Sequence, residues 1–105
     1  MTISSTDLER AEAVKVAFNW DRMTVTFADG RALSVPVDWY PRLKHSSARE
    51  RENWQIIGDG TGITWPEIDE DLSVAGLLAG RRSMETNKSF ARWMERRSKK
   101  NRKSA

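Results

Sequence analysis

Four carboxylates crowd into one short stretch of this sequence and are the first residues that could do chemistry: Glu67, Asp69, Glu70 and Asp71. Such a cluster could bind a cation or supply a general acid and base. A calcium-binding loop needs oxygens at alternate positions around a central glycine and a closing glutamate, and that pattern is absent here. We therefore expect Asp69–Asp71 to lie at the start of a helix, where exposed N–H groups favour carboxylates.

Two further features resemble catalytic or nucleotide-binding motifs only in part. The one histidine, His45, is the single candidate for the base of a nucleophilic triad, and no nucleophile elbow surrounds the serines that follow it. The segment Gly58–Gly62 contains three glycines but lacks the Lys-Ser/Thr ending of a P-loop. We expect His45 to be a surface residue before a helix, and Gly58–Gly62 to form a hairpin turn with positive φ. The sequence thus predicts a protein that is not an enzyme, with no cofactor and no metal site.

The C-terminal segment offers a stronger functional signal, because basic residues alternate there with aromatic ones. Such a segment can contact phosphates and stack on bases, with a strong dependence on salt. Docking of its aromatic residues on the domain is the alternative, with the final basic run as a solvated end. The candidate residues for binding a partner or nucleic acid are Lys88, Phe90, Arg92, Trp93, Arg96, Arg97, Lys99, Lys100, Arg102 and Lys103.

The charge is distributed very unevenly along the 105 residues. Residues 81–105 carry ten basic and two acidic side chains, a net charge of +8, whereas residues 1–80 carry eight basic and thirteen acidic side chains, a net charge of −5. This length fits one domain, which we place at residues 1–80, followed by a basic helix and tail at residues 81–105. The sequence contains no cysteine, no long apolar run and no secretory signal, so we expect a cytoplasmic protein that does not bind membranes.

Alternating apolar residues predict a three-stranded antiparallel meander. The alternation runs over residues 14–18, 23–27 and 33–37, with Asp29-Gly30 as a hairpin turn and Pro36 marking an edge or the end of a strand. Before these strands, residues 4–11 could form a helical turn. We predict a second strand pair over residues 54–57 and 63–65.

Short helices should cover this sheet, which gives an α+β fold. Ser47 and Glu50 have capping-box spacing and predict a helix over residues 48–53. Asp71 or Ser73 could cap a second helix that Gly80 ends. Phe90, Trp93 and Met94 are spaced for an amphipathic helix over residues 88–97, capped by Asn87, with residues 98–105 disordered in isolation.

Three stretches resemble the bacterial domain-of-unknown-function family 2442, over roughly residues 12–80. They are Val25–Arg31, Val35–Leu43 and Glu50–Val74, and the run Trp65-Pro66-Glu67-Ile68-Asp69-Glu70-Asp71-Leu72-Ser73 is the most specific part. The resemblance implies a small α+β fold and a bacterial, phage or plasmid origin, but no activity. Some relatives carry a helix-turn-helix domain after this module, for which residues 81–105 are too short. Others are encoded beside a small partner, as in a toxin–antitoxin pair.

These observations favour a non-enzymatic interaction or regulatory module, such as the antitoxin-like half of a two-protein pair. We expect the domain to bind a protein partner and the tail to bind a partner or nucleic acid. The sequence is also compatible with a homodimer. One alternative is an inhibitor whose acidic face, including Glu67, Asp69, Glu70 and Asp71, mimics nucleic acid. A second alternative is a small enzyme that uses the Glu67–Asp71 cluster.

Overall fold

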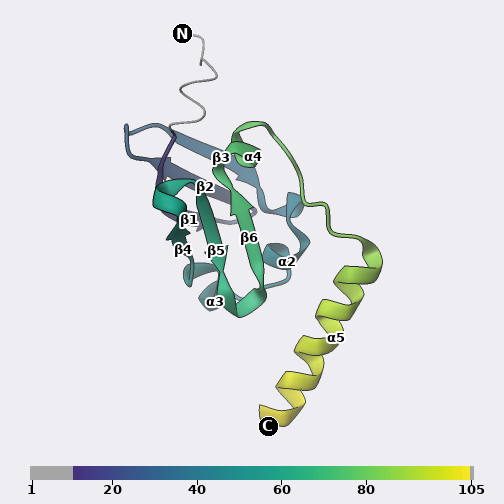
Figure 1. Cartoon of the computed structure of the whole chain (residues 1–105). Coiled ribbons are helices and arrows are strands. Elements are labelled where there is room, and N and C mark those ends of the chain that lie inside the picture. The colour runs from purple at the N-terminus through teal and green to yellow at the C-terminus, as the bar shows by residue number, and fades with distance from the viewer. Residues whose placement is uncertain (1–10, 105) are drawn as a thin grey trace.

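The computed structural model describes the backbone of residues 11–104 and the side chains of residues 11–99 (Figure 1). Two three-stranded antiparallel sheets and several short helices form the body of the molecule, and a long helix follows at the C-terminal end. This is the α+β fold that the sequence predicts. The predicted helical turn over residues 4–11 lies, apart from Ala11, outside the described residues.

The first sheet is the predicted meander. It comprises β1 (Ala13–Asn19), β2 (Arg22–Phe27) and β3 (Ala32–Pro36), in the order β1-β2-β3. The Asp29-Gly30 turn is confirmed, with φ +93° at Gly30, and β3 is an edge strand that ends at the predicted proline. At the other hairpin tip, Trp20 has φ +57° and a 90% exposed side chain.

The second sheet has one strand more than we predicted. It comprises β4 (Gln55–Ile57), β5 (Gly62–Trp65) and β6 (Glu70–Ser73), in that order. The prediction that Asp69–Asp71 start a helix is wrong, because these residues turn into and form β6. A 3-10 turn over Pro66–Ile68 and a left-handed Asp69 (φ +54°) reverse the chain, which then pairs with β5.

The short helices lie largely where capping residues predict them. A capping box at Ser47 opens α3 (Ala48–Glu52), and the Ser73 hydroxyl accepts the Gly76 N–H at 2.9 Å to open α4 (Val74–Leu78). A 3-10 turn (Val37–Trp39) and α2 (Pro41–Lys44) occupy the connection between β3 and α3, for which we predicted no helix. Another 3-10 turn at Gly58–Gly60 uses positive φ at all three of its residues, as expected of this turn.

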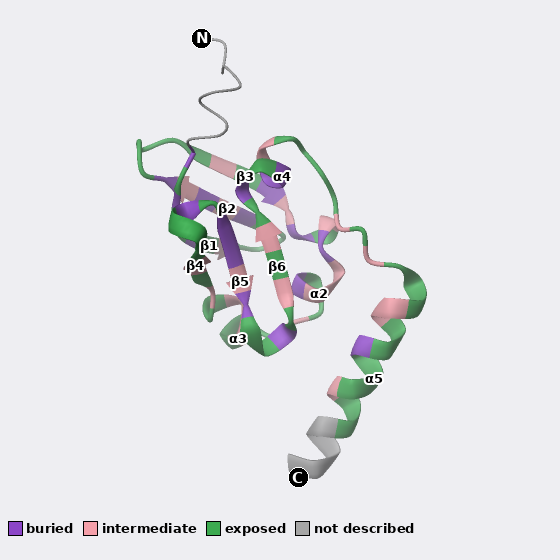
Figure 2. Cartoon of the chain, viewed as in Figure 1, coloured by how far each residue is buried: buried purple, intermediate pink, exposed green. Residues whose placement is uncertain are grey.

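The core lies between the two sheets and the helices beside them (Figure 2). The Trp65 side chain is fully buried at its centre, and its indole N–H donates to the Arg51 carbonyl oxygen at 3.0 Å. The largest fully buried side chains are those of Trp65, Met23, Leu43, Ile63, Ile68, Val25, Val37 and Val74. Because these residues come from both sheets and from α2, the core joins the whole body into one unit.

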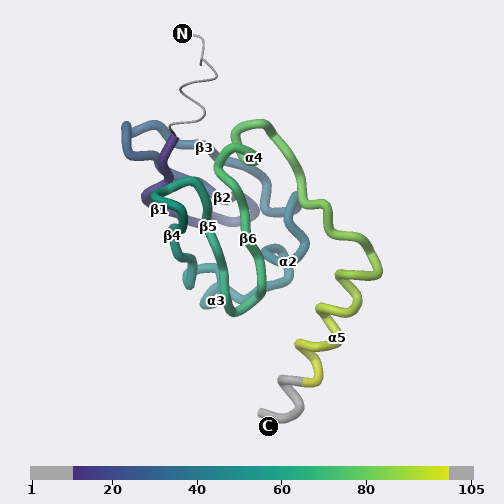
Figure 3. The backbone as a smooth tube through the Cα atoms, viewed as in Figure 1, coloured from purple at the N-terminus to yellow at the C-terminus, as the bar shows by residue number. Residues whose placement is uncertain are grey.

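The C-terminal helix α5 (Asn87–Ser104) is longer than predicted, since we expected it to end at Arg97 (Figures 1 and 3). It follows an extended segment over residues 80–86 and runs obliquely away from the sheets. Its Trp93 side chain is nevertheless part of the core. None of the described helices is long and apolar enough to cross a membrane.

Candidate functional site

The first turn of α5 is capped by Thr86 and not, as predicted, by Asn87. The Thr86 hydroxyl oxygen accepts the Ser89 N–H at 3.1 Å, and its carbonyl oxygen accepts the Phe90 N–H at 2.9 Å. The hydroxyl bond spans three residues, as expected of an N-cap. This cap fixes where the helix begins and therefore which of its faces turns toward the domain.

One face of α5 docks on the body of the protein through aromatic side chains. Trp93 is 3% exposed, and its indole N–H donates to the Ile68 carbonyl oxygen at 2.9 Å. Phe90 stacks on Trp93 with ring centroids 5.5 Å apart and lies 5.1 Å from the exposed His45 ring. Docking of the two aromatic residues, one of the two alternatives from the sequence, is what the structure shows.

An ion pair continues the docked face by one helical turn. The Arg97 guanidinium donates two hydrogen bonds to the Glu50 carboxylate, both at 2.8 Å, and lies 4.6 Å from the centre of the Trp93 ring. Glu50 also accepts the Ser47 N–H in the capping box of α3. These bonds, the one from Arg97 foremost, lower the pKa of Glu50 to about 2.

A second face of α5 carries exposed basic side chains, and Arg96 stands at its border with the docked face, where it lines a hollow with Glu67 and Asp69. Positions 88, 92, 96 and 99 are separated by four, four and three residues and therefore form one stripe along the helix. All four side chains are exposed, and only Lys99 has an ion-pair partner within the described residues, Glu95 at 3.3 Å. The helix backbone continues through Lys100, Arg102 and Lys103, whose side chains lie outside the described set. We call Lys88, Arg92, Arg96 and Lys99 the outer basic face.

The extended segment before α5 is tied to the domain by Arg42, a residue that the sequence did not single out. Its guanidinium forms an ion pair with Glu85 at 2.8 Å and donates to the Asp69 carbonyl oxygen at 2.8 Å. The Ser83 N–H donates to the Trp39 carbonyl oxygen at 3.1 Å. These contacts place the segment beside β6, and no sequence motif marks them.

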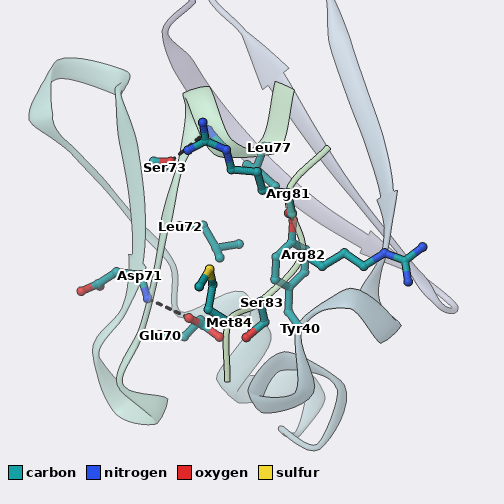
Figure 4. A pocket seen from close by; sticks show the side chains of 11 residues that line it. Tyr40, Glu70, Asp71, Leu72, Ser73, Leu77, Arg81, Arg82, Ser83 and Met84 are labelled. Atoms are coloured by element: carbon teal, nitrogen blue, oxygen red, sulfur yellow. Dashed lines mark hydrogen bonds between the residues drawn. The ribbon is translucent and has the colours of Figure 1, made fainter. Parts of the chain in front are cut away.

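A cavity of about 210 Å³ lies between β6, α4 and the segment over residues 81–84 (Figure 4). The Glu70 side chain turns into it, and Met84, which is 94% exposed, lies at its rim. The Arg82 side chain points away and lies over the Trp39 ring. Burial raises the pKa of Glu70 to about 7, aided by Glu85 and Asp71 and opposed by Arg42. The lining residues are Tyr40, Glu70, Asp71, Leu72, Ser73, Gly76, Leu77, Arg81, Arg82, Ser83 and Met84.

The four predicted acidic residues do not converge on one point. Glu67 accepts a hydrogen bond from the Asn53 amide, Asp69 lies 3.5 Å from Arg42, and Asp71 accepts one from the Thr64 hydroxyl. Only Glu70 turns into the cavity, and the Asp71 carboxylate points away from it. Among residues 11–99, no group of three or more histidine, aspartate or glutamate side chains is arranged to hold a metal ion.

The comparisons with known proteins agree with this architecture. The model of a family described as "Protein of unknown function (DUF2442)" matches residues 12–83, so α5 lies beyond the matched region. A crystal structure of a protein of unknown function from Rhodospirillum rubrum superposes with a TM-score of 0.64 and 27% sequence identity, over 72% of this chain and 94% of that one. No curated protein matches this chain. The chain belongs to the DUF2442 family of proteins of unknown function.

Proposed function

We propose that this chain is a non-enzymatic interaction module whose helix α5 binds the phosphate backbone of a nucleic acid. The observation that carries the proposal is the division of α5 into two faces. Phe90, Trp93 and Arg97 attach the helix to the domain, and the side chains of the outer basic face are left exposed. A helix that is docked through one face and exposes a row of basic side chains on another is suited to contact phosphates.

The arrangement of charge within the outer basic face supports this reading. Lys88, Arg92 and Arg96 follow one another at intervals of four residues, and like charges at that spacing destabilise a helix by about 0.2–0.5 kcal/mol per pair. A polyanion would remove this repulsion on binding. The favourable interaction of cations with the C-terminal end of a helix is confined to its last turn and does not explain Lys88 or Arg92.

The docked aromatic residues change how binding would occur. Phe90 and Trp93 are packed against the domain and are turned away from the outer basic face. Binding would therefore depend on contacts with phosphates and not on stacking with bases. Contacts with phosphates carry no direct sequence information, so the expected binding is sequence-independent and falls steeply with salt.

The experiment compares three forms of the full-length chain by fluorescence anisotropy with a labelled DNA duplex and a labelled single-stranded RNA. One form is unchanged. In the second, Lys88, Arg92 and Arg96 are each replaced by glutamine. The third, a matched control, carries the same three-unit charge change on the domain, through Lys15→Gln, Lys44→Gln and Arg49→Gln.

We expect the second form to lose most of its affinity for both probes at low salt and the control to keep it. Equal losses in the two variants would mean that net charge, and not the position of α5, governs binding. Absence of binding by the unchanged chain would overturn the proposal and leave an acidic protein as the partner to seek for this face.

A further inference from the structure

Strand β6 forms the outer edge of the second sheet, and its backbone groups alternate in direction. The Val74 N–H donates to the Thr61 carbonyl oxygen at 2.9 Å, and Leu72 lies opposite Ile63 two residues earlier. In an antiparallel pair, successive residues direct their backbone groups alternately toward the partner strand and away from it. Asp71 and Ser73 therefore direct their N–H groups away from β5, toward the side of the cavity.

The outward N–H groups of β6 have no backbone partner in the described part of the chain, whereas the Ser73 carbonyl oxygen serves α4 as the carbonyl of its N-cap. The Asp71 N–H donates only to the Glu70 carboxylate of the preceding residue, at 3.2 Å. The segment over residues 81–84 passes the same edge without pairing with it. Its own N–H groups are used elsewhere, that of Arg81 by Gly76 at 3.0 Å and that of Ser83 by Trp39. An unpaired edge of this kind is a template for one more strand.

The cavity beside this edge has the size and chemistry of a pocket for one side chain. Its volume of about 210 Å³ is below the roughly 300–1,000 Å³ of cofactor and drug-sized sites. Leu72 and Leu77 supply apolar walls, Met84 lies exposed at the rim, and the carboxylate of Glu70 lies inside. An apolar stem with a cationic end matches this lining, which describes a lysine or arginine side chain.

The charged groups around Glu70 leave its carboxylate available to such a cation. Arg42, the nearest base that acts on it, is already engaged by Glu85 and by the Asp69 carbonyl oxygen. Within the described residues, Glu70 forms no ion pair shorter than 4.0 Å. Above pH 7 most of the carboxylate is ionised, because its pKa is about 7. Of the two arginines at the cavity, Arg81 extends toward Ser73 and Arg82 lies over the Trp39 ring, and neither forms an ion pair with Glu70.

We propose that the free edge of β6 binds an extended peptide segment of a partner protein, which adds a strand to the second sheet and places a lysine or arginine side chain in the cavity against Glu70. The segment pairs with the outward N–H and C=O groups of Asp71 and with the outward N–H group of Ser73. Recognition combines backbone hydrogen bonds, which are independent of sequence, with one pocket that selects a cationic residue. This site is separate from the outer basic face of α5, and it stands whether or not α5 binds nucleic acid.

The test uses the full-length, isotope-labelled chain above pH 7 and a synthetic peptide, acetyl-Thr-Val-Lys-Val-Thr-amide, as the probe. Two matched peptides replace the lysine by norleucine or glutamate, and n-butylamine tests whether an amine alone is sufficient. The readouts are the amide resonances and exchange rates of Asp71 and Ser73.

Three variants separate the contributions of backbone and side chain. Asp71→Pro removes the outward N–H and leaves the β5–β6 ladder intact, because that N–H takes no part in it. Asp71→Ala loses the same side chain but keeps the N–H. Glu70→Gln removes the charge in the cavity, with Glu52→Gln, an exposed carboxylate on α3, as its control.

We expect the lysine peptide to shift and protect the Ser73 amide and to bind about tenfold or more tightly than the glutamate peptide, as a charge-assisted hydrogen bond implies. Asp71→Pro should abolish binding and Asp71→Ala retain it. Glu70→Gln should remove the preference for lysine but keep the Ser73 shift. The proposal fails if no peptide shifts the Ser73 amide at about 1 mM. It also fails if that amide is already as protected as Leu72 in the free protein, or if n-butylamine gives the same shift.

Discussion

Replacement of Trp93 by alanine should release α5 from the domain. The Trp93 side chain is 3% exposed, and its indole N–H donates to the Ile68 carbonyl oxygen. Truncation of a buried tryptophan to alanine costs about 3–5 kcal/mol. The buried carbonyl oxygen left without a donor accounts for about 1–3 kcal/mol of this cost. The remaining contacts of the docked face are a partly buried Phe90 and one ion pair, and they are too few to offset such a loss.

Once released, α5 should lose most of its helical structure while both sheets persist. Most helical stability in proteins comes from packing of an amphipathic face, and isolated helices shorter than about 12–15 residues are marginal in water. Helix α5 has 18 residues, only slightly more, and the like charges along its outer basic face weaken it. The other large core residues, such as Trp65 and Ile63, pack within the body of the protein. Amide hydrogen exchange followed residue by residue should show α5 exchanging rapidly and β2 and β5 still protected.

A neighbouring substitution provides the control. Met94 is next to Trp93, is 40% exposed, and differs little from alanine in helix propensity, so Met94→Ala should leave α5 protected. Persistent protection of α5 in Trp93→Ala would refute the claim that docking holds the helix. Collapse of protection in β2 and β5 as well would show that α5 is an integral part of the core and not an attached arm.

Three further predictions concern the domain itself. The lowered pKa of Glu50 stabilises the fold above pH 4.5 by up to about 3 kcal/mol, and this stabilisation should be lost as the pH falls from 4.5 toward 2. Urea titrations at a series of pH values measure the loss, which should be absent from Glu50→Gln. The raised pKa of Glu70 has the opposite sign, so Glu70→Gln should stabilise the protein by up to about 3 kcal/mol above pH 7 and have no effect below pH 4.5 in the same assay. Gly60→Ala should lower the free energy of unfolding by at least about 1–3 kcal/mol in thermal denaturation, because φ is +96° and the new Cβ would lie 2.9 Å from the Glu12 Cα. Gly30→Ala is the control, since no atom lies near its Cβ and it should lose only the free energy of the backbone strain.

Local patterns were sufficient to predict the first sheet and most of the short helices. The alternation over residues 16–37 indicates which side chains face the core, and Asp29-Gly30 supplies a turn that needs positive φ. It fails at Val14, which is 50% exposed, because the register of β1 shifts between Ala13 and Lys15. The Ser47 capping box is likewise a signal contained in four consecutive residues. Each of these elements is specified by residues close together in the sequence, and for that reason it could be predicted from a single sequence.

The strand β6 could not be predicted because its defining interactions are not local. Glu70-Asp71-Leu72-Ser73 contains a single apolar residue, and its acidic residues precede a real helix whose cap is Ser73. The pairing that makes it a strand is with β5 across a left-handed Asp69. An acidic run before a helix can therefore be the first turn of that helix or a strand that leads into it, and the local sequence pattern favoured the first, wrong interpretation.

The candidate sites were predictable to different degrees. The spacing of Phe90 and Trp93 identified an apolar face of α5, and the basic residues on the other side followed from the same periodicity. The acceptor for Trp93, a backbone carbonyl oxygen at Ile68, has no signature in the sequence. The cavity at Glu70 depends on the ion pair of Arg42 with Glu85, which lie 43 residues apart in the sequence. This ion pair holds the segment before α5 beside β6.

The salt dependence of nucleic-acid binding tests the central claim most directly. The logarithm of the binding constant of the full-length chain for a DNA duplex should fall linearly with the logarithm of salt concentration. The slope of that plot should decrease by roughly 0.9 for each phosphate contact removed when Lys88, Arg92 and Arg96 are replaced by glutamine. The control with Lys15, Lys44 and Arg49 replaced should keep the original slope. An unchanged slope in the α5 variant, or the same decrease in both variants, would contradict the assignment of the outer basic face as the nucleic-acid interface.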